Sequence, residues 1–194
     1  MTETRDRIVD AAVDLFRVHG YTGTAMQQVV AAAGAPNGSV YHHFRGGKEE
    51  LAAVAIERAG AVYRDLVLAI IDTEDDLVSG TRVAFEAAAT VLDETDYIDA
   101  CPVGTVALEV ASTSELLREA CQRVFDDWTE AFTARLVEAG AEHAAARTAS
   151  LTVIAVLEGA FMLSRTARSP EPMRACGDAA VAAVSRALGR SGVP

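Results

Sequence analysis

The chain has 194 residues, of which 51% are hydrophobic, and its formal net charge is -11. A chain of this length and composition can bury a sizeable core, as one large domain or two small ones, which excludes a disordered chain. Its three cysteines are odd in number and far apart, so they predict neither a disulfide framework nor a zinc site, and they fit a reducing cytoplasm.

The first predicted element is an amphipathic helix. The opening residues, MTETRDRIVD, mix acidic and basic side chains and lack the apolar stretch of a signal peptide. Helical periodicity then predicts a helix that starts after Thr2 or Thr4 and ends at Gly20. The apolar residues that recur at helical spacing are Ile8, Ala12, Leu15 and Phe16.

Two short helices with a tight turn between them are predicted next. Thr24-Ala-Met-Gln27 has the form of a capping box, in which the threonine and glutamine side chains each satisfy a backbone N–H group. The helix that follows is expected to run to about Ala33. Gly34 favours the left-handed conformation that ends a helix, and Pro36 suits the first turn of the next one. The sequence therefore predicts a turn over residues 34–37.

The segment GAPNGSVYHHF, residues 34–44, has three interpretations: a metal or catalytic site, a piece of aromatic core, or a surface that contacts a polar, anionic partner. Adjacent His42 and His43 point about 100° apart on a helix, so they cannot chelate one ion together. No catalytic sequence motif appears in the chain. Val40 and Phe44 are four residues apart and are expected to face the core. The side chains left to project elsewhere are those of Asn37, Ser39, Tyr41, His42 and His43, whose polar groups hydrogen-bond phosphates or base edges.

The distribution of charge favours the third interpretation. Residues 1–60 hold six basic and seven acidic side chains, whereas residues 61–194 hold 11 basic and 21 acidic ones. From Leu15 to Lys48 there is no Asp or Glu, although an even spread would place about five there. One local surface thus escapes the acidity of the rest, and an anionic partner can approach it.

Longer helices are predicted beyond this window. Lys48 opens an amphipathic pattern of about 24 residues, in which Gly60 is either a bend or a point of close packing. The apolar run 151–163, interrupted by Thr152 and Glu158, is shorter than the roughly 20 residues that cross a bilayer. No strand alternation appears, so the expected fold class is all-α, with about nine helices: a three-helix N-terminal domain and a larger C-terminal helical domain. The further helices are predicted over 77–92, 102–111, 115–139, 142–167 and 170–188.

Three short helices with a glycine-containing turn before the third match the helix-turn-helix arrangement, whose last helix enters the DNA major groove. The segment RDRIVDAAVDLFRVHGYTGTAMQQVVAAAGAPNGSVYHHFRGGKEEL resembles the DNA-binding domain of the TetR family of bacterial transcriptional regulators. Further on, DACPVGTVALEVAS and VLEGAFMLSRTARSPEPM resemble the effector domain of its LmrA/YxaF-like branch. The resemblance implies an all-helical homodimer, usually a repressor, whose C-terminal domain binds a small molecule that weakens DNA binding. It implies a DNA-binding domain over 1–47 and an effector-binding and dimerisation domain over 48–194.

The resemblance also assigns candidate DNA contacts. By motif position, Thr24 and Lys48 are expected to contact phosphates, and Gln27 belongs to the same surface. Pro36 departs from the family pattern, because many relatives carry Ser or Thr there, so a hydroxyl contact is lost. The expected recognition helix comprises Asn37, Gly38, Ser39, Tyr41, His42 and His43. Simpler roles stay open, since Thr24 can cap its helix, Tyr41 can pack its ring inside, and His43 can cover Phe44.

The C-terminal domain offers weaker candidates for a ligand site. Aromatic side chains at helical spacing line a cavity or belong to the core, and the sequence does not separate these alternatives. Glu158 interrupts an apolar run, and a buried carboxylate needs a partner, either an arginine such as Arg135 or Arg165 or a ligand. The candidate ligand-binding residues are Phe85, Tyr97, Trp128, Glu158 and Phe161. The helices over 151–163 and 170–188 are the expected dimer surface.

The expected partners are double-stranded DNA, a second copy of the chain and a small, hydrophobic effector, with no cofactor, metal or catalytic residue. Two copies would present their recognition helices to a pseudo-palindromic operator. Two other classes remain open, an acidic helical protein-interaction module and an enzyme on a helical bundle. A DNA gel shift separates the first from a DNA-binding regulator, and turnover would reveal the second.

Overall fold

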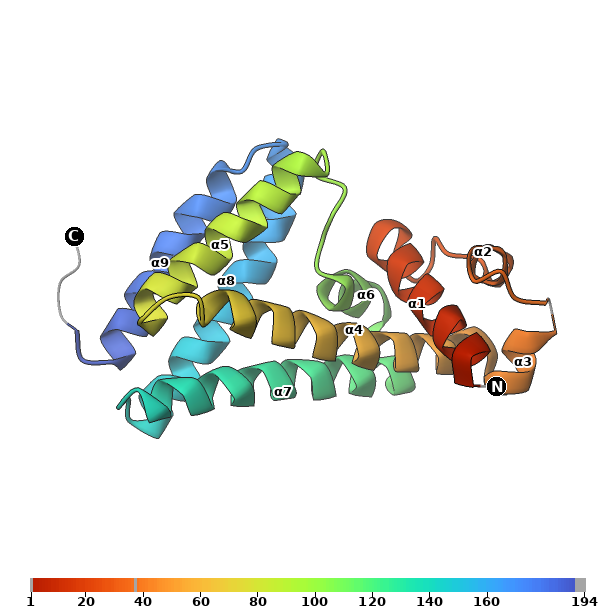
Figure 1. Cartoon of the computed structure of the whole chain (residues 1–194), viewed down its shortest axis with the longest axis horizontal. Coiled ribbons are helices and arrows are strands. Elements are labelled where there is room, and N and C mark those ends of the chain that lie inside the picture. The colour runs from red at the N-terminus through yellow and green to blue at the C-terminus, as the bar shows by residue number, and fades with distance from the viewer. Residues whose placement is uncertain (1, 37, 191–194) are drawn as a thin grey trace. The chain divides into compact units, whose positions relative to one another are not determined.

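The computed structural model describes residues 2–36 and 38–190, and the regular structure within these ranges is helical throughout (Figure 1). The described helices are α1 (Thr2–His19), α2 (Met26–Ala32), α3 (Ser39–His43), α4 (Gly47–Ile71), α5 (Leu77–Glu94), α6 (Pro102–Val110), α7 (Glu115–Glu138), α8 (His143–Ala167) and α9 (Glu171–Ala187). The all-α prediction is confirmed for this part of the chain. Helices α4 to α9 begin and end within two residues of the predicted limits.

The chain folds into two compact units. The first takes in the described residues of 1–62 and 100–125, and the second takes in those of 63–99 and 126–194. The N-terminal helices therefore share a unit with α6 and with the start of α7, which come from the middle of the chain. Helices α4 and α7 each contribute residues to both units.

The core of the first unit forms around α1, which contacts α2, α3 and α6. Each of these four helices contributes a large apolar side chain that is no more than 2% exposed. Burial of one such side chain is worth about 1.5–3 kcal/mol, so these contacts hold even the short helices α2 and α3 in place. The residues are Ile8 and Phe16 from α1, Val29 from α2, Val40 from α3 and Val106 from α6.

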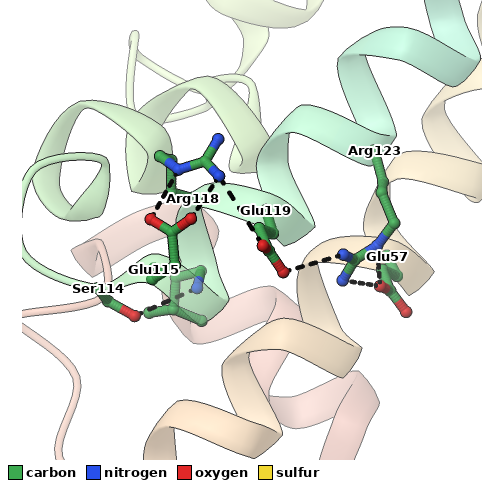
Figure 2. A network of polar contacts seen from close by, with 7 residues as sticks. Glu57, Ser114, Glu115, Arg118, Glu119 and Arg123 are labelled. Carbon is green, nitrogen blue, oxygen red and sulfur yellow. Dashed lines mark hydrogen bonds and ion pairs between the residues drawn. The ribbon is translucent and has the colours of Figure 1, made fainter.

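Polar contacts join the first half of α4 to the start of α7 (Figure 2). Arg123 Nη2 lies 2.8 Å from Glu57 Oε1 on α4. Ser114 Oγ accepts the Leu117 N–H at 3.2 Å, which caps α7, and it donates to a carboxylate oxygen of Glu49. The network continues along α7 through Glu115, Arg118 and Glu119. Exposed ion pairs contribute little free energy each, about 0–1 kcal/mol, but together these contacts fix the segment of α4 that follows Lys48.

In the second unit, α9 lies beside α8 and α5 (Figure 1). Two buried polar contacts accompany the apolar packing. Ser164 Oγ accepts the Met173 N–H at 3.0 Å and so joins α8 to α9. Thr133 Oγ1 donates to Ser150 Oγ at 3.0 Å and joins α7 to α8. Because buried hydroxyl groups are costly unless hydrogen-bonded, these pairs fix how the helices pack.

Helix α8 keeps an unusual amount of apolar surface exposed. Leu151 is 49% exposed, Met162 58% and Leu163 49%. Among the described helices, α8 is the one long and apolar enough to cross a membrane by length and composition alone, a test that core helices also pass. Exposed apolar side chains on one helix are typical of contact with another protein chain or a membrane.

Candidate nucleic-acid interface

The start of α2 differs from the predicted capping box by one residue. Ala25 is the N-cap, and Gln28 Oε1 accepts its backbone N–H at 2.6 Å, so the predicted pairing of Thr24 with Gln27 is wrong. The reason is that Thr24 is only 1% exposed and its Oγ1 donates to the Gly20 carbonyl at 2.8 Å. The Thr24 hydroxyl is thus buried inside the protein, whereas Gln27 is exposed.

The turn between α2 and α3 has the predicted form at its beginning. Gly34 has a φ of +57°, the left-handed conformation, and the Ala35 N–H donates to the Val30 carbonyl at 3.1 Å. Helix α3 then starts at Ser39, with Gly38 as its N-cap, so Pro36 lies before the helix rather than in its first turn. Asn37, which was expected to belong to the recognition helix, lies outside the described residues.

Helix α3 places its apolar and polar side chains on different sides. Val40 and Phe44 are fully buried, as predicted from their spacing. Tyr41 is 63% exposed and His42 is also exposed, so their phenol and imidazole groups face solvent. His43 is half-buried, and its ring lies edge-on to Phe44 at a centroid distance of 6.4 Å. The helix thus presents polar groups outward on a buried apolar anchor.

Lys48 stands in the first turn of α4, beside Tyr21 from the turn that follows α1. Its Nζ lies 4.2 Å from the centroid of the Tyr21 ring, a cation–π contact. Partial burial lowers the pKa of Lys48, and the negative charge of Glu109 opposes this shift. Burial raises the pKa of Tyr21, and the charge of Glu49 raises it further.

Three acidic side chains of the first unit, Asp6, Asp10 and Glu57, are held by arginines. Asp6 and Asp10 both pair with Arg58, at 2.7 Å and 2.9 Å. Glu57 pairs with Arg123 on α7 (Figure 2). Carboxylates that are already paired repel a nearby phosphate less than free ones do. The acid-free window from Leu15 to Lys48 and this pairing therefore both reduce the electrostatic repulsion of an anionic partner.

Two residues beside Lys48 were missed from the sequence, Tyr21 and Glu109. Tyr21 precedes Lys48 by 27 positions and Glu109 follows it by 61, so no local spacing connects them. The Thr22 N–H donates to Glu109 Oε2 at 2.7 Å, which brings the carboxylate to the turn. Only the folded chain shows that these two residues lie near Lys48.

The candidate ligand residues of the second unit separate into two groups. Phe85 is buried in a cluster with Ala160 and Met173, and the half-buried Tyr97 and Phe161 pack against it. The Tyr97 hydroxyl donates to Asp93 Oδ1 at 2.9 Å. In the described part of the chain, Trp128 on α7 and Glu158 on α8 do not belong to this cluster.

Glu158 lies on the side of α8 that carries exposed apolar residues. It follows Leu151 by seven positions and precedes Met162 by four, spacings that place side chains on one helical face. The two arginines considered as its partners have other contacts as well. Arg135 pairs with Asp72, and Arg165 Nε donates to the Tyr97 carbonyl at 3.2 Å.

The described residues contain no group of three or more His, Cys, Asp or Glu side chains placed to hold a metal ion. Burial raises the pKa of Cys121 to about 11, so its thiol is protonated at neutral pH and a poor metal ligand or nucleophile.

Comparison with known proteins gives two family matches along the chain. Residues 8–55 match the family described as "Bacterial regulatory proteins, tetR family". Residues 78–179 match "Transcriptional regulator LmrA/YxaF-like, C-terminal domain". The two matches occupy the segments in which the corresponding resemblances were found in the sequence.

Relatives with similar sequences cover most of the chain. The HTH-type transcriptional regulator LmrA of Bacillus subtilis is 34% identical over 88% of this chain and 91% of its own length. The uncharacterized HTH-type transcriptional regulator YxaF of the same species is 35% identical over 88% of this chain and 90% of its own. The HTH-type transcriptional repressor DhaR of a Mycobacterium species is 28% identical over 89% and 87%.

Solved structures share the fold. A TetR transcriptional regulator from Chloroflexus aurantiacus superposes with a TM-score of 0.73 at 27% identity, covering 95% of this chain and 96% of that one. The regulatory protein TetR from Rhodobacter sphaeroides gives a TM-score of 0.78 at 18% identity, covering 92% and 97%. The second likeness concerns the fold alone.

Proposed function

This chain belongs to the TetR family of bacterial transcriptional regulators and is a DNA-binding regulator rather than an enzyme, and on that basis we propose that it is a repressor, that it binds its operator as a homodimer, and that a small hydrophobic molecule releases it. The proposed division of labour assigns residues 1–47 to DNA binding and residues 48–194 to effector binding and dimerisation. The proposed location is the cytoplasm, where the chromosome of a bacterium is accessible.

The observation that carries the DNA-binding proposal is the arrangement of α3. Val40 and Phe44 anchor the helix in the core, which leaves Tyr41 and His42 exposed on its outer side. These groups can hydrogen-bond base edges, while Lys48 neutralises a phosphate. The proposed contacts are Gln27, Gly38, Ser39, Tyr41, His42, His43 and Lys48, together with Asn37 by its motif position. Thr24 is left out because its hydroxyl is buried and donates to Gly20.

The proposed dimer surface is the exposed apolar side of α8, together with α9. Leu151 and Met162 are about half exposed, and a second copy would cover them. Gly159 has open space where a Cβ would stand, so another helix can approach α8 closely at this point. Glu158 starts from the same side of α8, but its Oε1 is buried within the unit, so we keep it as a candidate for the effector site.

The proposed effector site is the aromatic cluster of the second unit. Tyr97 and Phe161 are half-buried against Phe85, so part of each ring can contact a ligand. A site lined by aromatic and aliphatic side chains favours a small hydrophobic molecule. The Tyr97 phenol and the carboxylate of Asp93, joined by a hydrogen bond, can orient its polar end.

Selection of bound sites from random DNA tests the proposal. We expect enrichment of a pseudo-palindrome whose half-site centres lie about one helical turn apart, or a multiple of it. Gel shifts on the selected site, repeated with a panel of small hydrophobic compounds, then test release. Recovery of no sequence motif would contradict operator recognition, and a motif without two-fold symmetry would contradict the homodimer.

A further inference from the structure

Glu109 on α6 is seated on the turn that joins α1 to α2. Its Oε2 accepts the Thr22 N–H at 2.7 Å, across 87 positions of sequence. Its Oε1 lies against Gly20, where a Cβ would stand only 1.9 Å from that oxygen. Gly20 also has a φ of +71°, so it meets two requirements that other residues do not. The carboxylate therefore has a defined place beside the DNA-binding helices.

The nearest role for this carboxylate concerns Lys48. Lys48 is the only lysine in the sequence, since the other sixteen of its 17 Lys and Arg residues are arginines. Its ammonium group lies over the Tyr21 ring, next to the residue whose N–H Glu109 accepts. The negative charge of Glu109 favours the protonated form of this ammonium group, so it raises the pKa of Lys48, whereas burial lowers it.

We propose that Glu109 is an internal competitor of DNA for Lys48: its carboxylate, fixed by the Thr22 N–H next to Tyr21, attracts the ammonium group over the Tyr21 ring through space and so opposes its contact with a DNA phosphate. The proposal rests on the proposed phosphate contact of Lys48. One ammonium group cannot neutralise two anions fully at once, so the carboxylate weakens the phosphate contact. A lysine can move its charge from the Tyr21 ring to a phosphate because the compact ammonium group sits on a flexible four-carbon chain, whereas a guanidinium group is a rigid fork. Glu109 is a positioning residue here, since it acts through Lys48.

A double-mutant cycle of Glu109→Gln and Lys48→Met tests the competition. Glutamine keeps a carbonyl oxygen that accepts the Thr22 N–H, and it removes only the charge. We expect Glu109→Gln to tighten binding to the selected operator roughly twofold to fivefold per subunit, the range typical of one unit charge a few ångströms from another near the surface. In the Lys48→Met background that gain should disappear, apart from the small general effect of removing one negative charge.

Glu50→Gln is the matched control for that general effect. Glu50 is two residues from Lys48, and its Oε2 accepts the Gly46 N–H at 2.7 Å, so the substitution also removes one charge and keeps an acceptor. Its effect on affinity should be the same with Lys48 present or replaced. The competition is overturned if Glu109→Gln gives the same gain in both backgrounds, gives no gain, or weakens binding.

A titration without DNA gives an independent readout. Because the chain has a single lysine, protein labelled with carbon-13 lysine gives one side-chain resonance to follow by NMR. Glu109→Gln should lower the pKa of Lys48, and an unchanged pKa would overturn the competition. Wild-type protein that binds DNA no better than Lys48→Met would overturn the proposed phosphate contact, and the competition with it. If wild-type protein binds DNA better than Lys48→Met, but Glu109→Gln has the same effect in both backgrounds, the competition is overturned and the phosphate contact stands.

Discussion

At the residue scale, the exposed side chains of α3 and the lysine of α4 are predicted to do different things. Replacing Tyr41 or His42 by alanine should abolish the preference for the operator over random DNA, because these exposed groups are the proposed base contacts. Lys48→Ala should weaken binding to every sequence and reduce the salt slope by about one unit per half-site, since it removes the proposed phosphate contact. Affinities for both kinds of DNA, measured across a salt series, check both effects.

The two kinds of variant serve as controls for each other. Each alanine removes one polar side chain from the same unit, so a loss caused by misfolding would lower binding to both DNAs alike. Equal losses on operator and random DNA for all three variants would contradict the division into base and phosphate contacts. Thermal unfolding of each variant shows whether the unit is still folded.

Thr24 is predicted to stabilise the protein rather than to contact DNA. Thr24→Val keeps the shape of the side chain but removes the hydroxyl that donates to the Gly20 carbonyl at 2.8 Å. The free energy of unfolding should fall by about 1–2 kcal/mol, because a buried carbonyl loses its donor. Urea unfolding measures this, with Thr22→Val as an exposed neighbour that should change little. A stable Thr24→Val protein that binds operator and random DNA more weakly by the same factor would restore the phosphate contact instead.

At the scale of elements, local signals defined the long helices well and the short ones less well. Helices α5 to α9 have apolar stripes, caps and glycine stops that agree with one another, so their limits were predictable. The start of α2 was misplaced by one residue because the Thr24 hydroxyl can form either of two local hydrogen bonds. It can accept a backbone N–H of α2, as predicted, or donate to the Gly20 carbonyl, as the structure shows. Such a choice depends on burial, which a sequence motif does not contain.

In the candidate site, too, some residues were predictable from local spacing and others were not. Tyr41 and His42 were predictable, because the spacing of Val40 and Phe44 decides which side of α3 faces the core. The placement of Glu109 beside the turn after α1 was not, because it depends on how α6 packs in the first unit. Residues that act on the site from another helix leave no periodic or motif signal.

Gly60 is predicted to be a point of close packing between α4 and α7. A Cβ at this position would lie 2.4 Å from Cγ1 and 2.6 Å from Cγ2 of Val124. Gly60→Ala should therefore lower the free energy of unfolding by about 1–3 kcal/mol, although alanine is the better helix former. Chemical denaturation of the purified protein measures the change.

Val124→Ala provides the matched background, because it removes both methyl groups that the new Cβ would meet. In that background Gly60→Ala should be neutral or stabilise the protein by up to about 1 kcal/mol, the difference in helix propensity. An equal loss in both backgrounds would show that Gly60 serves as a bend in α4 and not as a contact point.

At the scale of the whole molecule, the charges are arranged so that an acidic protein can bind an anionic partner. The net charge of -11 repels DNA at long range, but salt screens charges separated by more than about 10 Å at moderate ionic strength. What matters is the surface proposed to touch the duplex, and the window from Leu15 to Lys48 has no carboxylate. The acidity of residues 61–194 instead limits binding to DNA by any other face.

Dimerisation through α8 is the last prediction, and it concerns the assembly. Met162→Glu places a charge in the proposed dimer surface, and burying an unpaired carboxylate costs several kcal/mol, so the variant should be monomeric at micromolar concentration. Sedimentation velocity measures the oligomeric state, with Leu108→Glu as the control, since Leu108 is 85% exposed on α6 and the charge change is the same. A monomer has one recognition helix, so Met162→Glu should bind a single half-site with the same affinity as a full operator. If Met162→Glu remains dimeric while Leu108→Glu dissociates, the second copy binds through the first unit, and the exposed side of α8 is free for another partner.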